Sequence, residues 1–302
     1  MDSPFHTELD VPVAGGTLRV GVAGPTGGAP VVLALHGITG SHRSWNTVAR
    51  HLGQSVTFLA PDLRGRCGSG GLPGPYGFAR HVEDLVAVLD HVGAPRATLV
   101  GHSMGAYVAT RFAAAHPGLV SAVVLMDGGL PFPPVPDDVD PDKALAESIG
   151  PAIDRLSMAF PSREAYREFW RLHPAFSKAG RWSPDVEDYV DYDLGDPDPA
   201  TGALRSRVAE EAVRADGRDV LDAEAARRSV LGLTCPTVLL RAPYGFLDDP
   251  EPMISEELAA EMTAKLPNLI DVLVPETNHY MLAFGDREAA VVAERIAAAA
   301  GA

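Results

Sequence analysis

Short apolar runs alternate with amphipathic segments along most of this chain, and that alternation restricts the possible fold more than any other feature of the sequence. After two N-terminal runs, the apolar segments are continuous and rich in β-branched residues and leucine, as expected of parallel strands buried on both faces. Segments such as Phe78–Val92, where apolar residues recur at helical spacing, separate these runs. The rhythm predicts an α/β protein with a mainly parallel sheet and helices on both sides.

The expected strands and helices follow from these patterns. Strands are predicted at Thr7–Val13, Thr17–Ala23, Val31–Leu35, Val56–Leu59, Ala97–Val100, Val120–Met126, Thr237–Arg241 and Leu269–Val274. Helices are predicted at Phe78–Val92, Ser103–His116, Ser255–Leu266 and Asp286–Ala300. The second of these ends before Pro117, because proline disfavours helical backbone in the residue that precedes it.

The rhythm stops after the strand that ends at Met126, and no strand pattern appears again before Cys235. This gap of about a hundred residues is far longer than an ordinary connection. We therefore predict one core domain, residues 1–127 and 236–302, with a helical insertion at 128–235. An insertion at the carboxyl ends of parallel strands lies over the crevice where open α/β sheets bind ligands.

Two helices are expected within the insertion at Ile153–Leu172, separated at Pro161, with Ser162 as the N-cap of the second. The acidic runs Asp137–Asp142 and Asp185–Asp198 carry much of the negative charge of the chain. They are expected to form solvated faces or loops near the entrance of a pocket.

Composition excludes several classes of function. The 25 Lys and Arg residues against 40 Asp and Glu residues give a net charge of −15, which disfavours both nucleic acid and anionic membranes as partners. The N-terminus has Asp2 where a signal peptide carries basic residues, and no run reaches the roughly 18 apolar residues of a membrane span. A cytoplasmic location is the simplest expectation. Cys67 and Cys235 lie far apart without a metal-ligand pattern, so we expect free thiols and no metal.

A nucleophile motif stands where a predicted strand meets a predicted helix: Gly101-His102-Ser103-Met104-Gly105. The glycines permit a sharp turn that projects the central serine from its tip. A serine hydroxyl needs an adjacent base to act as a nucleophile. His279, between the last strand and the final helix, is the candidate, whereas His102 is expected to be structural.

Acyl transfer at a serine also needs N–H groups that stabilise the oxyanion. One donor is expected from the backbone of Met104, at the start of the helix after the serine. The second is expected from Ile38, in the loop His36–Gly40 that follows the third predicted strand.

Together, His36-Gly37, the segment Asp62–Ser69, Gly101–Gly105 and the late His279 resemble the α/β-hydrolase superfamily over essentially the whole chain. The resemblance implies an eight-stranded, mostly parallel sheet, a Ser–His–acid triad, a variable cap or lid at 128–235, and no metal or organic cofactor. Because the nucleophile position holds serine rather than aspartate, the resemblance favours esterases, lactonases and lipase-like enzymes over dehalogenases and epoxide hydrolases.

The acid of the triad departs from the family pattern. In most members it follows the strand after the cap, but here Gly245 stands at that point and Asp248 comes slightly later. Other members use the end of the strand before the cap, where this chain has Asp127. We predict Asp127, with Asp248 as the alternative, in the role of holding the His279 tautomer and stabilising its protonated form.

These residues predict a serine hydrolase that cleaves a carboxylic ester or lactone of a small-to-medium hydrophobic substrate through an acyl-enzyme on Ser103. The same triad serves C–C bond hydrolases, thioesterases and cofactor-free perhydrolases, and a ligand receptor of the same fold is the non-enzymatic alternative. Aromatic residues of the insertion either roof an apolar pocket or pack the insertion onto the core. They are Phe132, Phe160, Tyr166, Phe169, Trp170, Phe176, Trp182, Tyr189 and Tyr192. The sequence does not indicate an oligomeric state.

Overall fold

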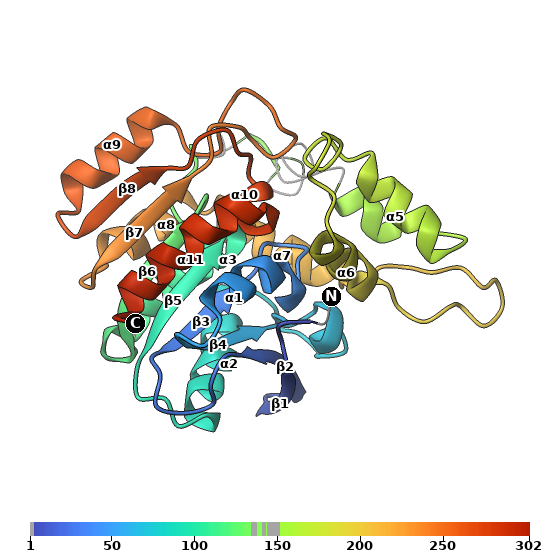
Figure 1. Cartoon of the computed structure of the whole chain (residues 1–302), viewed down its shortest axis with the longest axis horizontal. Helices are drawn as coiled ribbons and strands as arrows, with labels where there is room; N and C mark the ends of the chain where they lie inside the picture. The colour runs from blue at the N-terminus through green and yellow to red at the C-terminus, as the bar shows by residue number, and fades with distance from the viewer. Residues whose placement is uncertain (1–2, 134–137, 141–142, 144–151) are drawn as a thin grey trace.

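An eight-stranded sheet runs through the centre of the protein (Figure 1). The computed structural model describes residues 3–133, 138–140, 143 and 152–302. The strand order is β1-β2-β4-β3-β5-β6-β7-β8. The strands are β1 (Thr7–Val13), β2 (Gly16–Ala23), β3 (Val31–Leu35), β4 (Thr57–Pro61), β5 (Ala97–His102), β6 (Val120–Met126), β7 (Thr237–Arg241) and β8 (Leu269–Leu273).

Strand β2 pairs antiparallel with both β1 and β4. The pairs from β4 through β3 to β8 are parallel. The predicted mostly parallel, eight-stranded sheet is therefore confirmed. The central strands β3 and β5 are almost entirely buried, as their continuous apolar sequences require.

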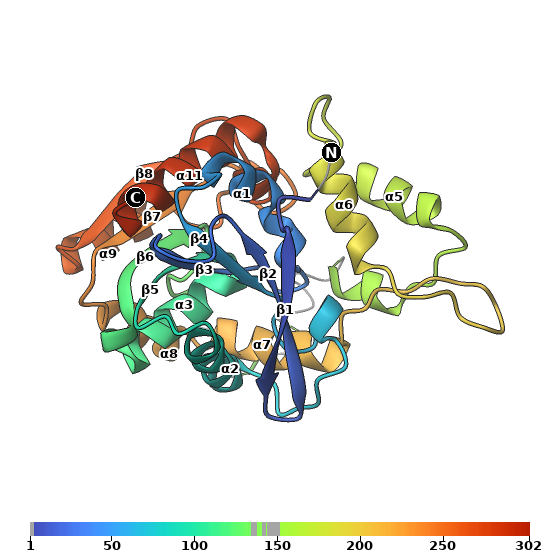
Figure 2. The same ribbon diagram turned by 60° about the horizontal axis from the view of Figure 1, so that its bottom comes forward.

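Helices cover both faces of the sheet. In Figure 2, α1 and α11 lie above the sheet, while α2, α3 and α8 lie below it. The bounds are α1 (Asn46–Leu52), α2 (Phe78–His91), α3 (Met104–Ala115), α5 (Arg163–Arg171), α6 (Pro184–Asp193), α7 (Glu210–Leu221), α8 (Ala223–Leu231), α9 (Glu256–Lys265), α10 (Met281–Phe284) and α11 (Asp286–Ala300). Each predicted core helix is present within one residue at either end. Outside the insertion, the sequence does not predict α1 and α10, which at 7 and 4 residues are too short for helical periodicity to show. Within the insertion, it does not place α6, α7 and α8 individually.

The insertion is helical in its described part. Residues 152–157 form one helix and α5 a second, and the Ser162 side chain caps α5 by accepting the Ala165 N–H at 3.2 Å. Both predicted helices and the predicted cap are therefore present. In Figures 1 and 2, α5 and α6 lie together at one side of the body, whereas α7 and α8 pack against α3. The later half of the insertion thus packs on a helix of the core, and the domain boundary at 128–235 stays a prediction.

The acidic run Asp185–Asp198 differs from the expected solvated loop. It begins inside α6, where Asp185 and Asp193 are buried. The Arg50 guanidinium binds Asp185 (Nη2 to Oδ1, 2.9 Å), and Arg155 forms a buried ion pair with Asp193. The expectation was wrong for these residues, because their arginine partners are distant in sequence.

In the other acidic run, Asp137, Pro141 and Asp142 lie outside the described residues. Among the described residues, no helix combines the length and the apolar character needed to cross a membrane.

Candidate active site

Ser103 occupies a left-handed turn between β5 and α3, with φ of 55°. A residue other than glycine is strained at a positive φ, and such strain often marks a functional position. Close backbone packing imposes the turn. A Cβ atom added at Gly101 would lie 2.3 Å from the Gly105 carbonyl oxygen, and one added at Gly105 would lie 2.1 Å from the Leu35 carbonyl oxygen. The two glycines of the motif are therefore required by space.

Asp127 follows the end of β6 and lies next to this turn. The Ser103 N–H donates to the Met126 carbonyl at 2.9 Å, and a Cβ atom added at Gly128 would lie 2.3 Å from the Ser103 carbonyl oxygen. The backbone N–H of Asp127 donates to the Leu240 carbonyl of β7 at 2.8 Å, which fixes the residue between two strands.

The side chain of His279 is buried against Asp127. Its Nδ1 donates to Asp127 Oδ2 at 2.8 Å, across 152 residues of sequence. This hydrogen bond holds the imidazole in the tautomer that leaves Nε2 free to accept a proton. The structure therefore brings Asp127, and not Asp248, to the ring of His279.

Asp248 lies nearby but binds other groups. It pairs with Lys178 Nζ at 2.5 Å and with Arg181 Nη1 at 2.8 Å, both from the insertion, and it accepts the Asn278 side-chain N–H at 2.9 Å. Burial alone would raise the pKa of this carboxyl, but these hydrogen bonds outweigh burial and lower it. Asp248 therefore ties the insertion to the loop that carries His279.

His102 supports the same loop. Its Nε2 donates to the His279 carbonyl at 2.9 Å, and the two rings lie 4.6 Å apart. Burial and the neighbouring His279 lower the pKa of His102 to about 3, so the imidazole is neutral near pH 7. Its contact to the His279 backbone matches the structural role expected from the sequence.

The loop after β3 is held in a single orientation by His36. The His36 Nδ1–H donates to the Gly37 carbonyl at 2.7 Å, and Nε2 accepts the Leu63 N–H at 2.9 Å. The Gly40 N–H also donates to the Gly37 carbonyl, at 2.9 Å. Because a trans peptide directs its N–H opposite its C=O, the Ile38 N–H points away from these donors. Ile38 and Ser103 line the same cavities.

Two adjoining cavities meet at Ser103. One is lined by His279, Tyr189, Tyr280 and Phe284 as well as Ser103. The other has a volume of about 280 Å³ and is lined by Met104, Tyr107 and Asp127 as well as Ser103. Its remaining walls are apolar side chains, contributed by Ile38, Phe132, Val220, Leu221, Phe246 and Met253.

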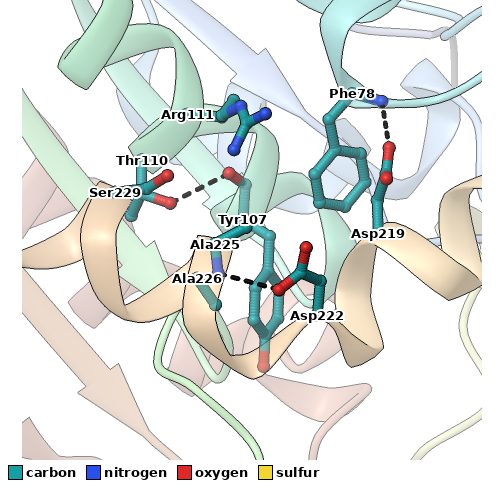
Figure 3. A pocket seen from close by; sticks show the side chains of 9 residues that line it. All are labelled: Phe78, Tyr107, Thr110, Arg111, Asp219, Asp222, Ala225, Ala226 and Ser229. Atoms are coloured by element: carbon teal, nitrogen blue, oxygen red, sulfur yellow. Dashed lines mark hydrogen bonds between the residues drawn. The ribbon is translucent and has the colours of Figure 1, made fainter.

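A separate small pocket lies on the outer side of α3 (Figure 3). Its carboxylates accept backbone N–H groups: Asp222, the N-cap of α8, accepts from Ala225 at 2.9 Å, and Asp219 accepts from Phe78 at 2.6 Å. Tyr107 lines both this pocket and the 280 Å³ cavity, so its ring forms part of the wall between them. Tyr107 is not among the site residues expected from the sequence. Its position one helical turn after Ser103 was the available signal.

Most aromatic residues of the insertion pack against one another rather than on a cavity. Trp170, for example, lies within 6.4 Å of the rings of Tyr166 and Phe169 and within 5.9 Å of that of Phe176. Of the nine aromatic residues named from the sequence, Phe132 and Tyr189 line the cavities at Ser103 in the part of the chain that the structure describes.

The two cysteines are free thiols, and burial raises the pKa of Cys67 well above its usual range. Among the residues described, no group of three or more His, Cys, Asp or Glu side chains is arranged to hold a metal ion.

The neutral histidines of the site predict a loss of stability in mild acid. Burial lowers the pKa of His36 to about 4 and that of His102 to about 3, from an ordinary 6.5. Between about pH 6.5 and about pH 4 the unfolded chain therefore binds protons that the folded chain does not, and the free energy of unfolding falls as the pH falls. Urea denaturation across this window measures the loss.

His102→Gln, which can still donate to the His279 carbonyl, should lose less stability over the same pH window than the wild type. An equal loss in the two proteins would contradict this explanation.

The site has the arrangement of a known fold. A family model described as the alpha/beta hydrolase fold matches residues 30–148. Lipase LipV of Mycobacterium tuberculosis is 37% identical over 142 residues, which cover 43% of this chain and 53% of the lipase. The chain thus spans about half the length, or less, of the first curated relatives that it matches.

Solved structures resemble the whole chain at low sequence identity. The E-2-(acetamidomethylene)succinate hydrolase superposes with a TM-score of 0.77 at 22% identity, over 98% of this chain and 99% of that one. A thioesterase domain from the curacin biosynthetic pathway superposes with a TM-score of 0.74 at 20% identity, over 96% and 98% of the two chains. With its sheet order and its serine turn after β5, this chain has the α/β-hydrolase fold.

Proposed function

We propose that this protein is a serine hydrolase that cleaves carboxylic esters or lactones of small-to-medium hydrophobic substrates. One arrangement carries the proposal: Ser103 and His279 line the same cavity, and His279 Nδ1 lies 2.8 Å from Asp127 Oδ2. A nucleophile, a base and a group that orients the base are the minimum for nucleophilic catalysis at serine.

The reaction follows the order of these groups. Ser103 Oγ attacks the acyl carbonyl while His279 Nε2 takes the hydroxyl proton, and the negative Asp127 stabilises the imidazolium that forms. The N–H groups of Ile38 and Met104 stabilise the oxyanion. His279 then gives its proton to the leaving alkoxide. Water, deprotonated by His279, attacks the acyl-enzyme, and the carboxylic acid leaves as Ser103 regains its proton.

The cavity supports an apolar substrate. Its walls beyond the polar groups at Ser103 come from side chains such as Phe132, Val220 and Met253. Apolar walls around a few polar groups are typical of sites that bury the hydrocarbon part of a ligand. The names of a lipase and a thioesterase domain among the similar proteins are in keeping with acyl transfer.

Ser103→Ala tests the nucleophile. The wild type should hydrolyse members of a panel of p-nitrophenyl esters and lactones and react with a fluorophosphonate at Ser103, and the variant should do neither. Ser229→Ala, a buried serine on α8, is the matched control and should keep both activities. Turnover of thioesters alone would assign the thioesterase alternative. A wild type that binds ligand, leaves every substrate intact and resists the fluorophosphonate would contradict the proposal and favour a receptor.

Asp127→Asn should lower kcat by roughly 10⁴, because the neutral side chain no longer stabilises protonated His279 or holds its tautomer. Asp248→Asn is the matched control at the second candidate acid. It should lower stability through the lost ion pairs with Lys178 and Arg181 and change kcat by less than about tenfold. Steady-state kinetics at equal folded fraction separate the two variants. Equal kcat values for both would exclude Asp127 as the acid.

Tyr107→Ala should lengthen the substrate pocket. Loss of the ring opens the wall between the 280 Å³ cavity and the outer pocket of Figure 3, so kcat/KM should shift toward longer acyl or alcohol chains. Tyr107→Phe keeps the ring and should retain the wild-type preference. A chain-length profile that is the same in all three proteins would show that Tyr107 does not limit the pocket.

A further inference from the structure

We propose that Arg66 is a positioning residue for the oxyanion hole, and that Asp216 of the insertion holds Arg66 in place. The proposal rests on the acyl-transfer function above. It makes that function depend on the contact that α7 forms with the core through Asp216. Neither residue lines the cavities at Ser103 among the described residues. Their effect is therefore exerted through the loop after β3.

Arg66 contacts both residues expected to donate to the oxyanion. Its side chain is fully buried, and Nε and Nη2 donate to the Ile38 carbonyl at 3.0 and 2.8 Å. Nη2 also lies 3.8 Å from the sulfur of Met104. A charged donor whose two N–H groups converge on one carbonyl oxygen holds that acceptor more tightly than a single neutral hydrogen bond does.

Hydrogen bonds on both sides of Ile38 hold the segment that carries the Ile38 N–H. The peptide before Ile38 is fixed because the Gly37 carbonyl accepts from His36 and Gly40. The peptide after Ile38 is fixed because Arg66 binds the Ile38 carbonyl. Since both neighbouring peptide planes are held, the two backbone torsions at Ile38 have little freedom. The Ile38 N–H lies in the first of these planes. Without Arg66 that plane keeps its bonds to His36 and Gly40 but loses the support of the plane that follows it, so the N–H can shift relative to Ser103.

A buried guanidinium requires a negative partner. Asp216, on α7 and equally buried, forms an ion pair with Arg66 Nη1 and also accepts from His81 Nε2 at 2.9 Å. Burial alone would raise the pKa of Asp216, but Arg66 and His81 outweigh burial and lower it to about 2, so the carboxylate is charged. The counter-ion of Arg66 therefore comes from the segment 128–235, while Arg66 itself comes from the loop after β4.

The same loop contains a matched control. Arg64 forms a buried, two-pronged ion pair with Asp84, with Nε–Oδ2 at 2.9 Å and Nη2–Oδ1 at 2.8 Å. Its other bonds go to the carbonyls of Ala14 and Pro73, not to Ile38. Breaking this pair should cost stability to a similar extent. The Arg64 backbone carbonyl accepts from Arg66 Nη1 at 2.9 Å, and a side-chain substitution at Arg64 keeps that carbonyl and the bonds of Arg66 to Ile38.

The test compares Arg66→Lys and Asp216→Asn with Arg64→Lys and Asp84→Asn in the full chain. The readouts are kcat and KM for an ester, and inhibition by an alkyl trifluoromethyl ketone. Ser103 Oγ adds to the ketone carbonyl, its proton passes to His279, and the carbonyl oxygen becomes an oxyanion in the hole. Inhibition by the ketone therefore reports the hole without depending on the identity of the natural substrate.

Arg66→Lys should lower kcat by about 10² with little change in KM, and it should weaken ketone inhibition by a similar factor, on the scale of one lost oxyanion donor. Asp216→Asn should change both quantities in the same direction. The control pair should lower the urea midpoint and leave kcat and ketone inhibition within about threefold of the wild type.

Equal losses of kcat in the two pairs at equal stability, or a loss confined to KM, would overturn the role of Arg66 while leaving the proposed function intact. A wild type that reacts with neither the ester nor the ketone would overturn the proposed function and this inference together.

Discussion

The backbone around Ser103 is the constraint on which the rest of the site depends. A left-handed serine at the tip of β5 requires that neighbouring backbone segments approach more closely than any side chain permits, and Gly101, Gly105 and Gly128 supply that space. Through these contacts the turn is packed against the ends of β3 and β6. The same packing therefore sets the position of Ser103, the proposed nucleophile, of the loop with Ile38 and of Asp127.

Parallel topology then brings the remaining groups to one edge of the sheet. Asp127 follows β6 and His279 follows β8, and their hydrogen bond closes a gap of 152 residues in sequence. The proposed nucleophile Ser103, acid Asp127 and base His279 follow one another along the chain in the order typical of the fold. The insertion contributes apolar walls to the cavity, and through α7 it contributes the carboxylate that pairs with Arg66.

The sequence predicts those features whose cause is local. Continuous apolar runs predict the strands, and glycine spacing between a strand and a helix identifies Ser103. The position of His279 between the last strand and the final helix predicts it as the base. Features that depend on pairing between distant segments carry no such signal. Asp127 and Asp248 both suit the acid position in the sequence. Only the 2.8 Å hydrogen bond between His279 and Asp127 distinguishes them. Asp185 and Asp193 suggested a solvated loop, because their arginine partners lie elsewhere in the sequence.

The central claim is that Ser103 carries the acyl group between two half-reactions. Rapid quenching of the protein with a p-nitrophenyl ester, followed by mass spectrometry of its peptides, tests that claim directly. The account predicts a transient mass increase equal to the acyl group on the peptide that contains Ser103, with its release limited by attack of water. Product formation with no acylated peptide at any time, or acylation at another residue, would contradict it.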